Sequence, residues 1–126
     1  MRTTKKGFTL AELAIVLVII GLLLGAILKG QGMVHNAKVR NVVKQADAVR
    51  AAVYTYMDLY KALPGDDQDA DEHVGAAHVG NGNGYIDGSE HYYMFEHLRE
   101  AGLVSGDYDG SNLPVHAFGD NMYMYW

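Results

Sequence analysis

The sequence contains no cysteine among its 126 residues. That absence excludes a disulfide framework, a thiolate zinc site and a cysteine nucleophile. The fold must therefore be held by packing, with a bound metal as the other option. A chain of this length is at most one ordinary domain.

Basic residues are nearly missing from the second half of the chain. Residues 62–126 contain twelve Asp and Glu but Arg99 as their only basic residue, whereas nine of the ten Lys and Arg lie in residues 1–61. Nucleic-acid surfaces need clustered Lys and Arg to contact phosphates. We therefore predict no nucleic-acid partner, and the acidic half fits calcium better.

The sequence also lacks the usual signs of catalysis. It has no Ser-His-Asp motif, no phosphate-binding glycine loop and no nucleotide fingerprint. Of its six histidines, His91 and His97 lie six residues apart, on different faces of a predicted helix, which does not favour a zinc site. A small acidic region has little room for a pocket that shifts a pKa, so we predict no catalytic residues and no enzyme.

The most prominent feature present is a long apolar run at residues 8–28, which contains one charged residue, Glu12. At a rise of about 1.5 Å per residue, such a helix spans a hydrocarbon core of about 30 Å. We predict a transmembrane helix over residues 8–30. Arg2, Lys5 and Lys6 precede it, which places the N-terminus in the cytoplasm and the rest of the chain outside. A secretory signal peptide is the competing interpretation, but its apolar region is shorter.

The helical pattern continues beyond the apolar run. Apolar residues recur at steps of three and four from Met33 to Tyr60, which predicts an amphipathic continuation over residues 31–62. The sequence Leu63-Pro64 ends this helix. Four glycines, each costing about 1 kcal/mol relative to alanine, predict bending or local melting within the helix; they are Gly21, Gly25, Gly30 and Gly32.

Glu12 is the most informative residue of the apolar run. An ionised carboxylate inside a spanning helix costs about 2.5–3.5 kcal/mol, so it usually marks a function or a partner. The alternative is that Glu12, about one turn from the cytoplasmic edge, is protonated or reaches the lipid headgroups.

Residues 5–13, with the sequence KKGFTLAEL, resemble the class III signal of type IV pilins and type II secretion pseudopilins. The resemblance implies a leader peptide, residues 1–7, that a prepilin peptidase removes by cleavage between Gly7 and Phe8. It further implies N-methylation of Phe8, and pairing of Glu12 with the Phe8 amine of a neighbouring subunit during filament assembly.

Residues 63–126 form a small head in which residues 79–90 resemble a twelve-position calcium loop. The candidate ligands are Asn81, Asn83, the Tyr85 carbonyl, Asp87 and Glu90, and Gly84 takes the position of the turn glycine. The first position is Val79 instead of Asp, which predicts weak affinity unless another carboxylate supplies the missing oxygen; the candidates are Asp66, Asp67, Asp69 and Asp71. The alternative is that Asn-Gly-Asn-Gly is simply a tight turn.

The remaining head sequence predicts an α+β, pilin-like fold. Residues 64–72 are polar and read as a loop, and a second helix over residues 90–101 follows an Asp87-x-x-Glu90 capping box. Its apolar side, with Met94, Phe95 and Leu98, should pack on the long helix. Residues 113–115 and 122–126 predict a short antiparallel sheet.

Together these features predict a structural subunit of a pilus-like filament. The small head and the calcium loop favour a type II secretion pseudopilin, since the resemblance implies calcium-stabilised heads. A type IV pilin for adhesion, motility or DNA uptake is the alternative, and a single-pass membrane-anchored calcium-binding module is the third. The expected partners are a prepilin peptidase, copies of the chain, minor pilin-like subunits and an inner-membrane assembly platform. The head would lie in the periplasm or on a surface filament.

Overall fold

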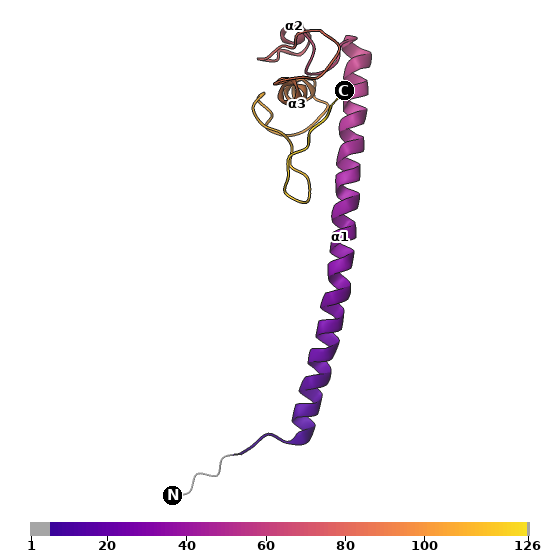
Figure 1. Cartoon of the computed structure of the whole chain (residues 1–126), viewed down its shortest axis with the longest axis vertical. Helices are drawn as coiled ribbons and strands as arrows, with labels where there is room; N and C mark the ends of the chain where they lie inside the picture. Colours follow the sequence, from indigo (N-terminus) through magenta and orange to yellow (C-terminus); the bar gives the residue numbers. More distant parts are fainter. Residues whose placement is uncertain (1–5, 126) are drawn as a thin grey trace, which may run out of the picture. The chain divides into compact units, whose positions relative to one another are not determined.

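The computed structural model describes residues 6–125, which form three helices. These are α1 (Leu10–Tyr60), α2 (Ala70–Val74) and α3 (Glu90–Glu100) (Figure 1). The chain divides into two compact units, of which the first ends at Ala37 and the second begins at Lys38. Most of the predicted leader, residues 1–5, lies outside the described residues.

Helix α1 confirms the long helix predicted over residues 8–62, with slightly narrower bounds. The expected local melting at the glycines is wrong, because the helical pattern continues through all four of them. Helix propagation adds one hydrogen bond per residue, and inside lipid an unsatisfied backbone group costs more than the glycine penalty. A continuous helix is therefore lower in free energy than a helix melted at its glycines.

In the first unit, α1 is apolar all round. Large apolar side chains from Leu13 to Leu28 are exposed. Helix α1 is long and apolar enough to cross a membrane, and its most apolar stretch is not buried by the other described residues. A helix that is hydrophobic on every face needs apolar surroundings on every face. This supports the predicted membrane-spanning segment.

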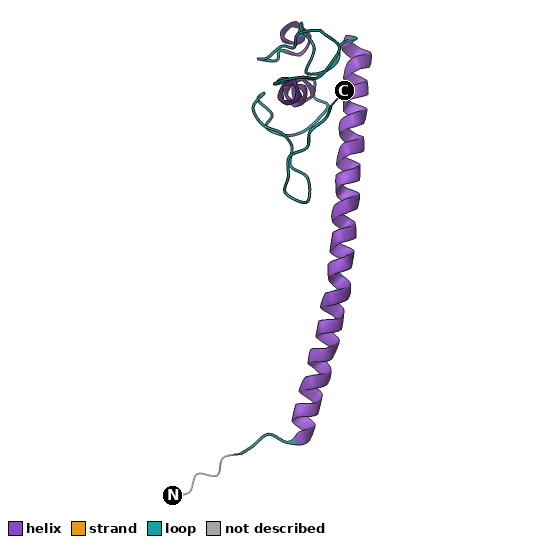
Figure 2. Ribbon diagram, in the orientation of Figure 1, coloured by secondary structure: helices purple, strands orange, loops and turns teal. Residues whose placement is uncertain are grey.

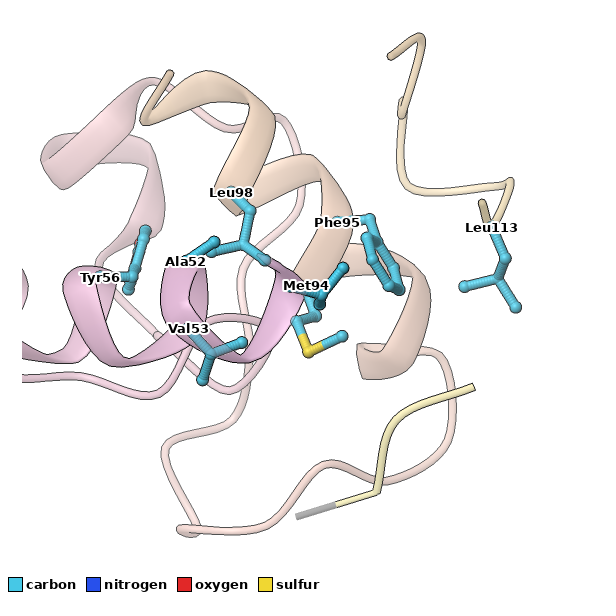
Figure 3. Close-up of a cluster of buried hydrophobic side chains, with 8 residues drawn as sticks. Ala52, Val53, Tyr56, Met94, Phe95, Leu98 and Leu113 are labelled. Atoms are coloured by element: carbon cyan, nitrogen blue, oxygen red, sulfur yellow. The ribbon is translucent and has the colours of Figure 1, made fainter. Parts of the chain in front are cut away.

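The second unit has a hydrophobic core formed by α1, α3 and the C-terminal segment. As predicted, α3 contributes Met94, Phe95 and Leu98, each at most 2% exposed. Figure 3 shows these side chains beside those of α1, with Leu113 at the edge. The α1 residues of this core lie at helical spacing, which is why one face of the helix is buried; they are Val49, Ala52, Val53 and Tyr56.

The predicted antiparallel sheet is not seen among the residues that the structure describes, and residue 126 of its second strand lies outside them. Residues 6–125 contain no strand (Figure 2), and the C-terminal segment makes a single antiparallel bridge between Val115 and Asn121. Val115, Tyr123 and Tyr125 are at least half exposed. The segment packs against the core through Leu113 and Met124, but a single two-stranded ribbon is marginal, so the aromatic and β-branched residues do not suffice for strands here.

Two local predictions in the head need correction. The end of the predicted loop, residues 70–72, belongs to α2, whose Ala70 is fully buried and whose C-cap Gly75 has a left-handed φ of 76°. Helix α3 is confirmed to within one residue. Its capping box is only half formed, because Glu90 accepts the Asp87 N–H, but the Glu90 N–H donates to the Asp87 carbonyl instead of its side chain.

Candidate functional site

The first candidate site is the N-terminal end of α1, where Thr9 and Glu12 form a reciprocal capping box. The Thr9 N–H donates to Glu12 Oε2 at 2.8 Å, and the Glu12 N–H donates to Thr9 Oγ1 at 3.2 Å. These bonds satisfy two of the N–H groups that a helix leaves unpaired at its start. They also hold the Glu12 carboxylate at the positive end of the helix dipole.

The capping role of Glu12 was missed in the sequence, although the signal was there. Thr9 and Glu12 have the T-x-x-E spacing that marks a capping box before an apolar run. These hydrogen bonds would lower the free-energy cost of placing the Glu12 carboxylate in lipid. They form within a single chain, before any neighbouring subunit arrives. Pairing of Glu12 with a neighbour stays a prediction.

The predicted processing site lies just before this capped helix end. Gly7 and Phe8 are not helical, and Phe8 is 85% exposed. Together with Lys6, Thr9 and Glu12 they line an open hollow of about 470 Å³. An extended, accessible peptide bond followed by a rigid helix is a suitable protease substrate. Cleavage between Gly7 and Phe8 and methylation of Phe8 remain predictions.

The second candidate site is the loop predicted to bind calcium. The amide oxygen of Asn81 accepts the Asn83 N–H at 3.0 Å, and that of Asn83 accepts the Tyr85 N–H at 2.8 Å. One carboxylate oxygen of Asp87 accepts the side-chain amide of Asn83 at 3.1 Å. Glu90 is buried, and both its oxygens accept backbone N–H groups. The side chains of Asn81, Asn83, Asp87 and Glu90 are therefore linked by hydrogen bonds, and each has at least one oxygen engaged with an N–H donor.

Of the four candidate carboxylates in the preceding acidic stretch, the one that bonds to this loop within the described residues is that of Asp66. Its two oxygens accept the N–H groups of Asn83 at 3.0 Å and Gly84 at 2.6 Å. An upstream carboxylate thus does lie against the loop, where it accepts N–H groups; that it supplies the missing calcium ligand stays a prediction. Within residues 6–125, no three His, Asp or Glu side chains gather closely enough to hold a metal ion. The arrangement fits backbone amides instead of a cation, and calcium binding stays a prediction.

The head also contains a buried network around Asp67 that the sequence did not reveal. Asp67 Oδ2 accepts the Tyr56 hydroxyl at 2.8 Å and lies 2.7 Å from His73 Nδ1, while Oδ1 accepts the Asp69 N–H. Burial opposes ionisation, but these hydrogen bonds prevail and lower the pKa of Asp67. Burial and the bond to Asp67 raise the pKa of Tyr56. The network ties the end of α1 to the loop that follows it.

A second network surrounds His97, which is fully buried in α3. Its Nδ1 accepts the Gly65 N–H at 2.9 Å and its Nε2 lies 2.8 Å from the His78 carbonyl oxygen, which fixes a neutral ring protonated at Nε2. The buried carboxylate of Glu96 accepts the Ala77 N–H and lies 2.8 Å from His78 Nδ1. Partners 18 to 32 residues apart give no local sequence signal.

The neutral state of His97 predicts a pH dependence of head stability. Burial lowers the pKa of His97 below its usual 6.5, against the opposing effects of the His78 carbonyl, Asp67 and Glu96. As the pH falls through 6.5, the unfolded chain takes up a proton that the folded head excludes, so His97 destabilises the head in acid. His73 acts in the opposite sense, because its bond to Asp67 raises its pKa and contributes stability that is lost as the pH rises.

We therefore expect the melting temperature of the wild-type chain to fall relative to that of His97→Gln between about pH 7.5 and pH 5. Glutamine can accept from Gly65 and donate to His78 but does not titrate in this range. Thermal unfolding of the full chain in detergent, followed by circular dichroism, measures the difference. His35→Gln, on the exposed side of α1, serves as the control. Parallel pH profiles for wild type and His97→Gln would contradict the assignment.

Comparison with known families identifies the N-terminal segment. Residues 2–28 match the family model described as the prokaryotic N-terminal methylation motif, the class III prepilin signal of type IV pilin-like proteins. The resemblance seen at residues 5–13 is thereby confirmed. No curated protein and no solved structure matches the chain.

Proposed function

We propose that this chain, which carries the N-terminal methylation motif, is a structural subunit of a type II secretion pseudopilus. The motif supports a type IV pilin-like or pseudopilin subunit, and the proteins that carry it are structural subunits. The motif also implies processing by a prepilin peptidase and assembly into a pilus-like filament.

The observation that carries this proposal is an acidic residue held at the start of an otherwise apolar spanning helix. Cleavage after Gly7 would make the Phe8 amine the new N-terminus, only four residues before Glu12. An amine and a carboxylate are both costly in lipid, and each relieves the other when two helices pack with an axial offset. Pairing between neighbouring subunits turns the membrane penalty of Glu12 into a drive for assembly.

The topology follows from the basic residues before α1. Lys6 and the two basic residues that precede it keep the N-terminus in the cytoplasm, so the acidic head lies in the periplasm until the subunit enters a filament. The exposed apolar surface of α1 is covered first by lipid and then by helices of other subunits. Minor pilin-like subunits and an inner-membrane assembly platform are the further partners.

The small head favours a secretion pseudopilin over a type IV pilus subunit. Beyond α1 it contains only α2, α3 and one β-bridge within the described residues. A pilin for adhesion, motility or DNA uptake is the second candidate, and it shares the same motif. A membrane-anchored module that does not assemble is the third.

Two measurements test the proposal. Mass spectrometry of the mature chain from cells containing a prepilin peptidase should find N-methylated Phe8 as the first residue; an uncleaved chain would rule out both filament functions. The culture-supernatant proteome of a deletion strain, compared with its complemented strain, should then lack several unrelated exported proteins. An unchanged supernatant with missing surface filaments would identify a type IV pilus subunit.

A further inference from the structure

The backbone N–H groups in the first half of the loop at residues 79–90 are hydrogen-bonded to oxygens of the chain itself. Donors from six consecutive residues, 80–85, have partners in the head: those of Gly80 and Gly82 donate to the carbonyls of Asp67 and Asp66, and the remainder donate to side-chain oxygens. A loop that binds a cation directs carbonyl and carboxylate oxygens toward its centre. Converging N–H groups instead form a nest that binds an anion.

Two buried carboxylates of the protein itself occupy this nest. Glu90, 5% exposed, accepts the Asn81 N–H at Oε1 and the Asp87 N–H at Oε2, both at 3.0 Å. Asp66, 4% exposed, accepts the N–H groups of Asn83 and Gly84 with its two oxygens. Each carboxylate thus has both oxygens engaged by backbone donors, which offsets the cost of burying its charge.

The glycines of the loop create the geometry that the nest requires. Gly82 and Gly84 have left-handed φ values of 73° and 89°, while Asn83 between them does not. Alternation of hand along a short segment points successive N–H groups to the same side. The two glycines on either side of Asn83 therefore suit the binding of the Asp66 carboxylate by the Asn83 and Gly84 N–H groups.

We propose that the carboxylates of Asp66 and Glu90 hold the backbone of this loop in place of a calcium ion, so that the head folds and keeps its shape in calcium-free medium. This differs from the expectation that the family resemblance raised. The inference does not depend on filament assembly, because it concerns contacts within one head. It would stand or fall independently of the proposed function.

The first test compares the full chain in detergent with calcium and with a chelator. We expect the melting temperature to differ by less than about 1 °C, since a ligand that does not bind the folded state does not shift unfolding. Amide hydrogen exchange should show equal protection of Asn81, Asn83, Gly84 and Asp87 in both conditions. A calcium-dependent rise in melting temperature, with a gain in protection at these amides, would overturn the proposal.

Paired variants distinguish a loop held by the Asp66 and Glu90 carboxylates from a loop held by calcium. Asp66→Asn and Glu90→Gln keep the side-chain volume but place an N–H₂ group against a backbone N–H, so each should lower the melting temperature by at least about 5 °C. Asp87→Ala is the matched control, because Asp87 is an expected calcium ligand whose carboxylate, as far as residues 6–125 show, bonds the exposed Asn83 side-chain amide. We expect it to change the melting temperature little.

The opposite pattern would refute the proposal. If Asp87→Ala abolished a calcium-dependent stabilisation, the loop would be a calcium site. If Asp66→Asn and Glu90→Gln melted like the wild type, the two carboxylates would not hold the loop. Should either of these variants fail to fold, the calcium titration of the wild type and of Asp87→Ala still decides the question.

Discussion

Replacing Glu12 by alanine is expected to leave cleavage between Gly7 and Phe8 intact and to abolish filament assembly. Alanine removes a carboxylate whose burial costs about 2.5–3.5 kcal/mol in the membrane, so the isolated subunit should insert at least as well as the wild type. It also removes the partner of the neighbouring Phe8 amine, which then has no counter-charge inside the filament core. Immunoblotting measures cleavage, and electron microscopy of sheared filaments measures assembly.

Two further variants show which property of Glu12 matters. Glu12→Gln can still accept the Thr9 N–H but has no charge, so it should fail to assemble if ion pairing is the requirement. Asp47→Ala removes an exposed carboxylate of α1 that pairs with Arg50, and it should assemble normally. Normal filaments from Glu12→Ala would refute the role assigned to this carboxylate.

Gly80→Ala is expected to be the most destabilising single substitution in the head loop. An added Cβ would lie 2.5 Å from the Gly65 carbonyl oxygen and closer still to the Asp66 backbone, neither of which is a flexible side chain. Relieving the overlap would separate the loop from the segment that contains Asp66. We expect a loss of about 3 kcal/mol in unfolding free energy, at the upper end for overpacking, and a melting temperature lower by more than about 10 °C.

Gly119→Ala provides the control for this prediction. Gly119 has a left-handed φ of 95°, but an added Cβ there would meet no atom within 4 Å. Its substitution should cost only the backbone strain, about 1–2 kcal/mol. Chemical denaturation of the full chain in detergent can compare the two. Gly80 itself does not have a left-handed φ, so a loss no larger than that of Gly119→Ala would show that the close approach of Gly80 to Asp66 does not limit the loop.

Several features of this protein could be predicted because they are local and repetitive. The apolar run and the steps of three and four residues predicted α1, and the Met94, Phe95 and Leu98 pattern predicted the buried face of α3. Period and apolarity act within a few turns of helix, so they are visible in the chain itself. The methylation motif is equally local, and it was identified from residues 5–13.

The predictions that failed concerned segments whose structure depends on distant contacts. The aromatic C-terminal segment has the composition of strands, but a single two-stranded ribbon is marginal, so within the described residues the predicted sheet is reduced to the Val115–Asn121 bridge. Residues 70–72 look like part of a polar loop, yet burial of Ala70 against the rest of the head supports a short helix. In both cases the neighbours in space override the local preference.

The sequence alone determined the long apolar helix, its amphipathic continuation, helix α3 and the class III prepilin signal, because each depends on short-range spacing and hydrophobicity. Only the tertiary structure decided what the acidic residues of the head do. Asp66 meets Asn83 and Gly84 across 17 and 18 residues, and Gly65 meets His97 across 32. A carboxylate in the sequence is equally compatible with a cation, a histidine or a backbone amide, and the folded chain selects the partner by bringing it within hydrogen-bond distance.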